Sequence, residues 1–77
     1  MLFLIEYDRN QGKLVTLQSF GESDQPLAER TRLELELELN RKAIEHEVVL
    51  LEATDEKALR RTHRRYFEDL SQLVKAS

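Results

Sequence analysis

The stretch Leu33-Glu-Leu-Glu-Leu-Glu-Leu39 decides the fold, because it fits two different elements. Strict alternation of apolar and charged residues is typical of a half-buried strand. Leu and Glu both favour a helix, however, and none of the seven residues is β-branched. At about 100° per residue, Leu33 and Leu37 lie on one side of such a helix and the other two leucines on another. Because these helix formers outweigh the alternation, we predict a helix over Leu27–Ala43. The alternative, a strand here, would make the middle of the chain a second hairpin.

Residues on either side of this stretch support the helix. Ser23 or Asp24 can accept hydrogen bonds from the free N–H groups of a first helical turn, and Pro26 suits that turn. At the other end, Arg41 and Lys42 stand where the helix dipole favours positive charge.

A β-hairpin is predicted before this helix. Leu2–Tyr7 is short and apolar, and Lys13–Phe20 alternates well enough to be its partner strand. The intervening residues, Asp8–Gly12, include Asp, Asn and Gly, which tolerate turn dihedrals. Alternation assigns the side chains of the second strand to two faces, with Val15 and Leu17 on one and Leu14, Thr16 and Gln18 on the other.

One further strand and one further helix are predicted after the helix over Leu27–Ala43. Ile44–Ala53 contains the apolar run Val48–Leu51, which is typical of a strand buried on both faces. Thr54 is an N-cap candidate, and two acidic residues follow it in the first helical turn. A one-sided amphipathic helix is then predicted from Asp55 to Lys75. Its apolar side carries Leu59, Thr62, His63, Tyr66, Phe67, Leu70, Leu73 and Val74.

These elements predict a single α+β domain over residues 1–77 with the order β-β-α-β-α. The first strand is apolar on both sides and should be central. The hairpin places the second strand beside it, and the crossover helix brings the third strand to its other flank. We expect a three-stranded antiparallel sheet of order 2-1-3 with both helices on one face.

Composition narrows the function classes. The 77 residues include no cysteine, which excludes disulfides and thiolate metal sites. Twelve basic against fifteen acidic residues give a net charge of −3, which disfavours general binding to nucleic acid or anionic membranes. No apolar stretch approaches the roughly 20 residues of a membrane span, and no signal-peptide pattern is present. We expect a cytoplasmic protein.

The most conspicuous string is Arg60-Arg-Thr-His-Arg-Arg65, in which Arg60, Arg61, Arg64 and Arg65 could contact phosphate or carboxylate oxygens. The alternative is a solvated helix face, since three pairs stand at the i,i+4 spacing of surface ion pairs. These pairs are Glu56–Arg60, Arg64–Glu68 and Arg65–Asp69.

His63 and Tyr66 are the best candidates for a catalytic or ligand-binding pair. His63 lies on the apolar side of the last helix, where a core histidine bonded to a neighbour is the more common case. His46-Glu47 begins like a zinc-protease signature, but the required second histidine is missing. Nothing in the sequence commits to an enzyme, and we expect neither a metal nor a cofactor.

The leading hypothesis is a small non-enzymatic interaction or accessory module that forms a homodimer through its sheet. Both alternating sets of the first and third strands are apolar, so helices on one face would leave an apolar patch on the other. A second copy could cover that patch or extend the sheet at the third strand. The alternative is a nucleic-acid-associated or regulatory protein that uses the Arg60–Arg65 face. A third hypothesis is an enzyme or ligand binder that uses His63 and Tyr66.

Overall fold

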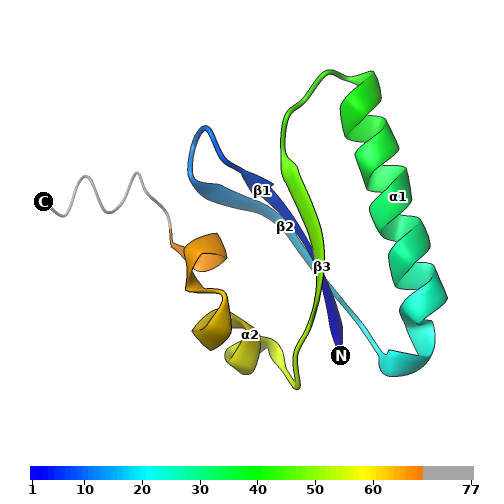
Figure 1. Cartoon of the computed structure of the whole chain (residues 1–77), viewed down its shortest axis with the longest axis vertical. Coiled ribbons are helices and arrows are strands. Elements are labelled where there is room, and N and C mark those ends of the chain that lie inside the picture. Colours follow the sequence, from blue (N-terminus) through cyan, green and yellow to red (C-terminus); the bar gives the residue numbers. More distant parts are fainter. Residues whose placement is uncertain (69–77) are drawn as a thin grey trace, which may run out of the picture.

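The structure is a computed structural model and describes residues 1–68. The predicted element order and the α+β class are confirmed (Figure 1). The elements are β1 (Leu2–Asp8), β2 (Lys13–Phe20), the 3-10 helix η1 (Glu22–Asp24), α1 (Gln25–Arg41), β3 (Glu47–Glu52), α2 (Glu56–Thr62) and the 3-10 helix η2 (Arg64–Phe67). No helix within the described residues is long and apolar enough to cross a membrane.

The three strands form an antiparallel sheet of order β2-β1-β3, as predicted. β1 is central, and its side chains are buried from Phe3 to Asp8. The turn between β1 and β2 is closed by the Asp8 carboxylate, which accepts hydrogen bonds from the N–H groups of Asn10 and Gln11. Gly12 completes the turn at φ 63°, a left-handed conformation that glycine adopts without strain.

The two helices cover opposite faces of the sheet, so the prediction that both lie on one face is wrong (Figure 1). On one face, α1 packs against Leu4 of β1. On the other, Leu59 of α2 and Tyr66 of η2 pack against Ile5. The reason lies in β1, because both of its alternating sets are apolar and each requires its own cover.

The stretch from Leu33 to Leu39 is helical, as predicted. Leu39 is buried and Leu35 is half-buried against the sheet. Leu33 and Leu37 point away from the sheet and are 55% and 59% exposed. The helix therefore uses only one of the two leucine sides that the alternating sequence provides.

A β-bulge in β2 changes the predicted faces of that strand. Glu6 pairs with Thr16 and Tyr7 pairs with Leu14, so Val15 is an extra residue without a partner on β1. Leu14 and Leu17 consequently pack against the same cluster on the α2 face, although alternation predicted opposite faces. Thr16 follows the bulged residue along the chain, and the regular register places it opposite Glu6.

The last helix is shorter than predicted. α2 ends at Thr62, and His63 has φ −125° and ψ 53°, which is not helical. Thr and His are weak helix formers, and the Thr62 hydroxyl donates to the Ala58 carbonyl oxygen at 3.1 Å. The predicted part from 69 to 75 lies outside the described residues. The N-cap is Asp55 rather than Thr54, since Asp55 Oδ1 accepts from the Ala58 N–H at 2.7 Å.

The chain leaves α1 through Ala43, which has φ 56°. Ile44 N–H donates to the Leu39 carbonyl oxygen at 2.9 Å, so a left-handed residue closes the helix, as in common helix C-caps. Glycine usually occupies this position, because a Cβ there costs roughly 1–2 kcal/mol. Ala43 therefore carries local backbone strain.

Ala43→Gly is expected to raise the free energy of unfolding by about 0.5–1 kcal/mol, which is the relieved strain less the entropy that glycine adds to the unfolded chain. Urea unfolding monitored by circular dichroism measures the change. Asn40→Gly, within regular helix, is the control and should lower stability by a similar amount. Destabilisation by both substitutions would show that Ala43 is not strained.

Candidate functional site

The arginine-rich segment spans α2 and η2, and its side chains go to different places. Arg60 donates to Glu56 at 3.0 Å, and Arg64 lies 3.9 Å from Glu68. Arg61 is exposed. Two of the predicted i,i+4 pairs are therefore present, and these three arginines form a solvated, partly paired surface. Binding of nucleic acid by this segment stays a prediction.

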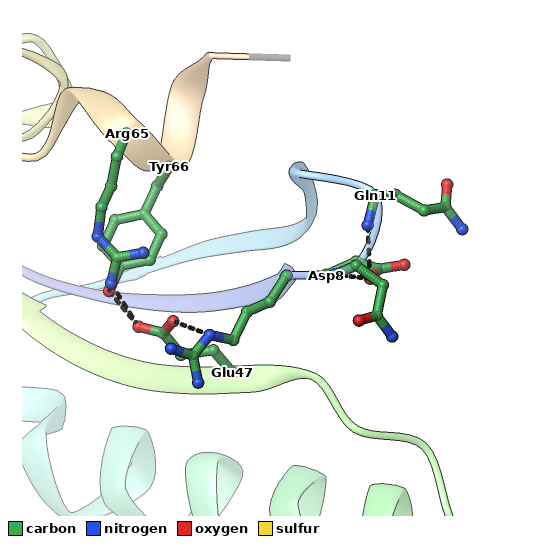
Figure 2. Close-up of polar contacts among 7 residues, drawn as sticks. Asp8, Gln11, Glu47, Arg65 and Tyr66 are labelled. Carbon is green, nitrogen blue, oxygen red and sulfur yellow. Dashed lines mark hydrogen bonds and ion pairs between the residues drawn. The ribbon is translucent and has the colours of Figure 1, made fainter. Parts of the chain in front are cut away.

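Arg65 differs from the other arginines because it reaches β3 (Figure 2). Its Nη2 donates to Glu47 Oε2 at 2.8 Å and to the hydroxyl oxygen of Tyr66 at 2.6 Å. The Tyr66 hydroxyl donates in turn to the same oxygen of Glu47. The predicted partner of Arg65, Asp69, lies outside the described residues. These contacts, which we call the Glu47 cluster, join η2 to the first residue of β3.

The shifts in pKa within the Glu47 cluster follow from these contacts. Burial raises the pKa of Tyr66, and the hydrogen bond to Glu47 raises it further. The same hydrogen bond lowers the pKa of Glu47 against the opposing effect of burial. The hydrogen bond to Glu47 raises the pKa of Arg65. The fold thus favours a neutral Tyr66 between an ionised Glu47 and a charged Arg65.

His63 is half-buried beside Tyr66. The two rings stack with their centroids 6.4 Å apart and an interplanar angle of 25°. His63 Nδ1 lies 2.9 Å from the Thr62 hydroxyl oxygen. Because the Tyr66 hydroxyl is bonded to Glu47 and Arg65, the structure gives His63 a packing position and no hydrogen bond to its proposed catalytic partner.

A second polar cluster, which the sequence reasoning missed, lies on the α1 face. Glu6 and Asp8 are only 6% and 9% exposed although they belong to the central strand. Glu6 accepts a hydrogen bond from the Thr16 hydroxyl at 2.8 Å, and its other oxygen lies 2.6 Å from His46 Nδ1. His46 Nε2 is 3.6 Å from Asp8. We call this the Glu6 cluster.

A signal for the Glu6 cluster was present in the sequence. Glu6 interrupts an apolar strand at a position expected to be buried, and a buried carboxylate requires polar partners. The zinc-protease pattern pairs His46 with Glu47, whereas the strand turns the two side chains to opposite faces of the sheet. Within residues 1–68, no group of three or more His, Cys, Asp or Glu side chains could hold a metal ion.

Two open cavities meet at His46. One, of about 320 Å³, lies toward α1, and the other, of about 610 Å³, lies toward the β1–β2 turn. Their lining residues are Glu36, Leu39, Asn40, Ile44, His46 and Val48 for the first, and Arg9, Asn10, Glu45, His46 and Glu47 for the second. None of these residues carries a hydroxyl or thiol nucleophile.

The outer edge of β3 is the most regular free surface of the sheet. Met1 and Ala53 exchange both backbone hydrogen bonds, and the two strands then pair without interruption. Because hydrogen-bonded and non-bonded pairs alternate along antiparallel strands, the backbone groups of residues 47, 49 and 51 face β1. Those of Val48, Leu50 and Glu52 face outward.

The outer edge of β2 is irregular by comparison. The bulge at Val15 interrupts its row of backbone groups and increases the local twist, a feature that protects edge strands from pairing. Lys13 at its start and Gln18 near its middle are exposed. Only the β3 edge thus offers an uninterrupted row of backbone donors and acceptors within the described residues.

The shape of the molecule leaves the β3 edge accessible. The structure measures 43 × 33 × 12 Å, and three strands side by side span about 10 Å. The short dimension therefore runs across the strands, as seen in Figure 1, where the three strands overlap between the two helices. The β3 edge consequently lies along one broad side of a flat molecule.

Comparison of the chain with protein-family models, with curated proteins and with solved structures finds no match in any of the three.

Tyr66→Phe should lower the free energy of unfolding at pH 7 by about 1.5–3 kcal/mol, because it removes a hydrogen bond to a charged group. Urea unfolding measures the change. Tyr7→Phe is the matched control, since the Tyr7 hydroxyl makes no hydrogen bond within residues 1–68, and it should have little effect.

The loss in Tyr66→Phe should also depend on pH. The pKa of Glu47 is lowered in the folded state, so its contribution is complete above its ordinary pKa and is lost as the pH falls through the lowered value. The wild type and Tyr66→Phe should therefore converge in stability as the pH falls below the ordinary pKa of a glutamate and through the lowered pKa of Glu47. A difference that stays constant from pH 7 to acid would contradict an ionised Glu47 as the acceptor.

Proposed function

We propose that this protein is a non-enzymatic interaction module that forms a homodimer by pairing β3 with β3 of a second copy. The observation that carries the proposal is the regular outer edge of β3, with the backbone groups of Val48, Leu50 and Glu52 directed outward. Addition of a strand to such an edge is a common mode of protein recognition, in which backbone hydrogen bonds supply affinity.

The edge replaces the sheet face that the sequence suggested for dimerisation. That suggestion assumed helices on one face only, whereas α1 and α2 each cover a face. Within residues 1–68, neither face of the sheet is therefore left open for a second copy to cover. The other route considered from the sequence, extension of the sheet at the third strand, remains, and the geometry of the edge supports it.

Burial gives a reason for the edge to be paired. Val48, Val49, Leu50 and Leu51 are only half-buried, although all four are apolar and pack against one of the two cores. A neighbouring strand would remove part of their remaining surface from water. Domains of this size bury a smaller share of their surface on folding than larger domains do, and they often depend on oligomerisation for stability.

The proposal predicts different effects for proline at adjacent positions of β3. Val48→Pro removes an outward N–H, so the monomer should fold while the dimer loses two hydrogen bonds and dissociates. Val49→Pro removes an N–H bonded to β1 and should cost about 1–3 kcal/mol more in stability. Light scattering at micromolar concentration and urea unfolding measure the two effects.

The expected pattern is a wild-type mass of two chains, a folded Val48→Pro monomer and a destabilised Val49→Pro protein. A wild type with the mass of one chain would overturn the proposal. So would a Val48→Pro protein that is folded and still dimeric.

A further inference from the structure

We infer that the second copy pairs with β3 in one antiparallel register, in which Val49 lies opposite Val49 of the second copy. This inference rests on the proposed function and specifies the partner surface. It follows from three constraints that the described residues impose on any such pairing, namely backbone alternation, burial and charge.

Backbone alternation is the first constraint. Val48, Leu50 and Glu52 direct their N–H and C=O groups outward, so these residues must lie opposite residues of the same set. Any antiparallel pair of identical strands that is centred on one residue meets this condition. Registers centred on Val49 or Leu50 pair five residues of β3 with β3 of the second copy, whereas those centred on Val48 or Leu51 pair three, and the Leu51 register also sets Leu50 opposite Glu52. Shifting one of the two strands by a single residue would place backbone groups that already bond β1 at the joint between the copies.

Burial excludes the register centred on Val48. There Glu47 would lie opposite Val49, and Leu51 would pass beyond the paired strands to face Glu45. Val49 and Leu51 would thus each meet an acidic residue and Leu50 would meet His46, which removes the gain from covering these three apolar residues. In the other two registers, the apolar residues in the middle of β3 meet apolar residues.

Charge separates the remaining two registers. In the register centred on Leu50, Glu52 of one copy would lie opposite Val48 of the other copy. Val48 borders the cavity that is also lined by Glu36, another acidic residue. Centred on Val49, the joint sets Glu52 opposite His46, which lies on the same face and is 19% exposed. Glu6 occupies Nδ1 of this histidine, so Glu52 would approach Nε2, which lies 3.6 Å from Asp8. Oppositely charged or hydrogen-bonding residues directly across a sheet stabilise it. The Val49 register alone gives Glu52 such a partner.

Glu47 presents no obstacle to the Val49 register. Its side chain lies opposite Leu51 of the second copy on the α2 face, but its carboxylate is already bound by Tyr66 and Arg65. No acid is set opposite an acid along the paired strands. The joined sheet would contain six strands, with α1 of both copies on one face and α2 of both copies on the other.

Cysteine scanning tests the register, and the chain has no cysteine of its own. In the Val49 register, the two Val49 Cα atoms form a non-hydrogen-bonded pair about 4.5 Å apart, which a disulfide can bridge. The Cα atoms of the two Val48 residues, and of the two Leu50 residues, would be about 8 Å apart, beyond disulfide reach. Val49→Cys should therefore cross-link under mild oxidation, whereas Val48→Cys and Leu50→Cys should not.

Light scattering of each variant under reducing conditions, with circular dichroism as the check on folding, separates the outcomes. A dimer that cross-links through Leu50→Cys or Val48→Cys overturns the register and leaves the proposed function standing. A monomeric wild type overturns both. A third result also overturns both: the wild type is a dimer, none of the three cysteine variants cross-links, and Leu37→Glu dissociates the dimer. Leu37 lies on the outer side of α1, so the interface would then be that helix.

Discussion

The burial of both faces of β1 is the constraint on which the rest of the structure depends. Phe3, Ile5 and Tyr7 require one cover, and Leu4 requires another, so the two helices separate to opposite sides of the sheet. Within residues 1–68, this arrangement leaves the outer edges of β2 and β3 without a neighbouring strand. Coverage of the faces is thus achieved at the expense of the edges, and the edges become the surfaces available for other contacts.

Much of this fold could be predicted from local patterns. The limits of β2 and the helical state of the Leu33–Leu39 stretch follow from turn residues and helix propensity, and both agree with the structure. The placement of α2 could not be predicted in that way, because amphipathicity shows that a helix has a buried side and not which face of a sheet it covers. The bulge at Val15 was also missed, since it depends on cross-strand pairing and not on alternation within one strand.

The polar clusters also differ in how much of them a local sequence pattern can predict. The Arg60–Arg65 string stands out in the sequence. Within residues 1–68, Arg65 is the arginine of this string that bonds to a strand, through Glu47, eighteen residues away, while Arg60 lies over the Phe67 ring of η2. Glu6 and His46 are forty residues apart and carry no motif. Their neighbours in space are set by strand register, which no local pattern contains. Adjacent residues His46 and Glu47 thereby attach the start of β3 to both sides of the molecule, one through Glu6 and the other through Tyr66.

The bulge in β2 has a consequence for how far association can proceed. A three-stranded sheet with two equally regular edges would accept a neighbour on each side, and repeated pairing would generate an open-ended fibre. Here only one edge is regular, and a two-fold joint between identical edges consumes both of them at once. The proposed dimer would then be closed after two copies, with the bulged strands outermost. In that dimer the single extra residue Val15 would end polymerisation.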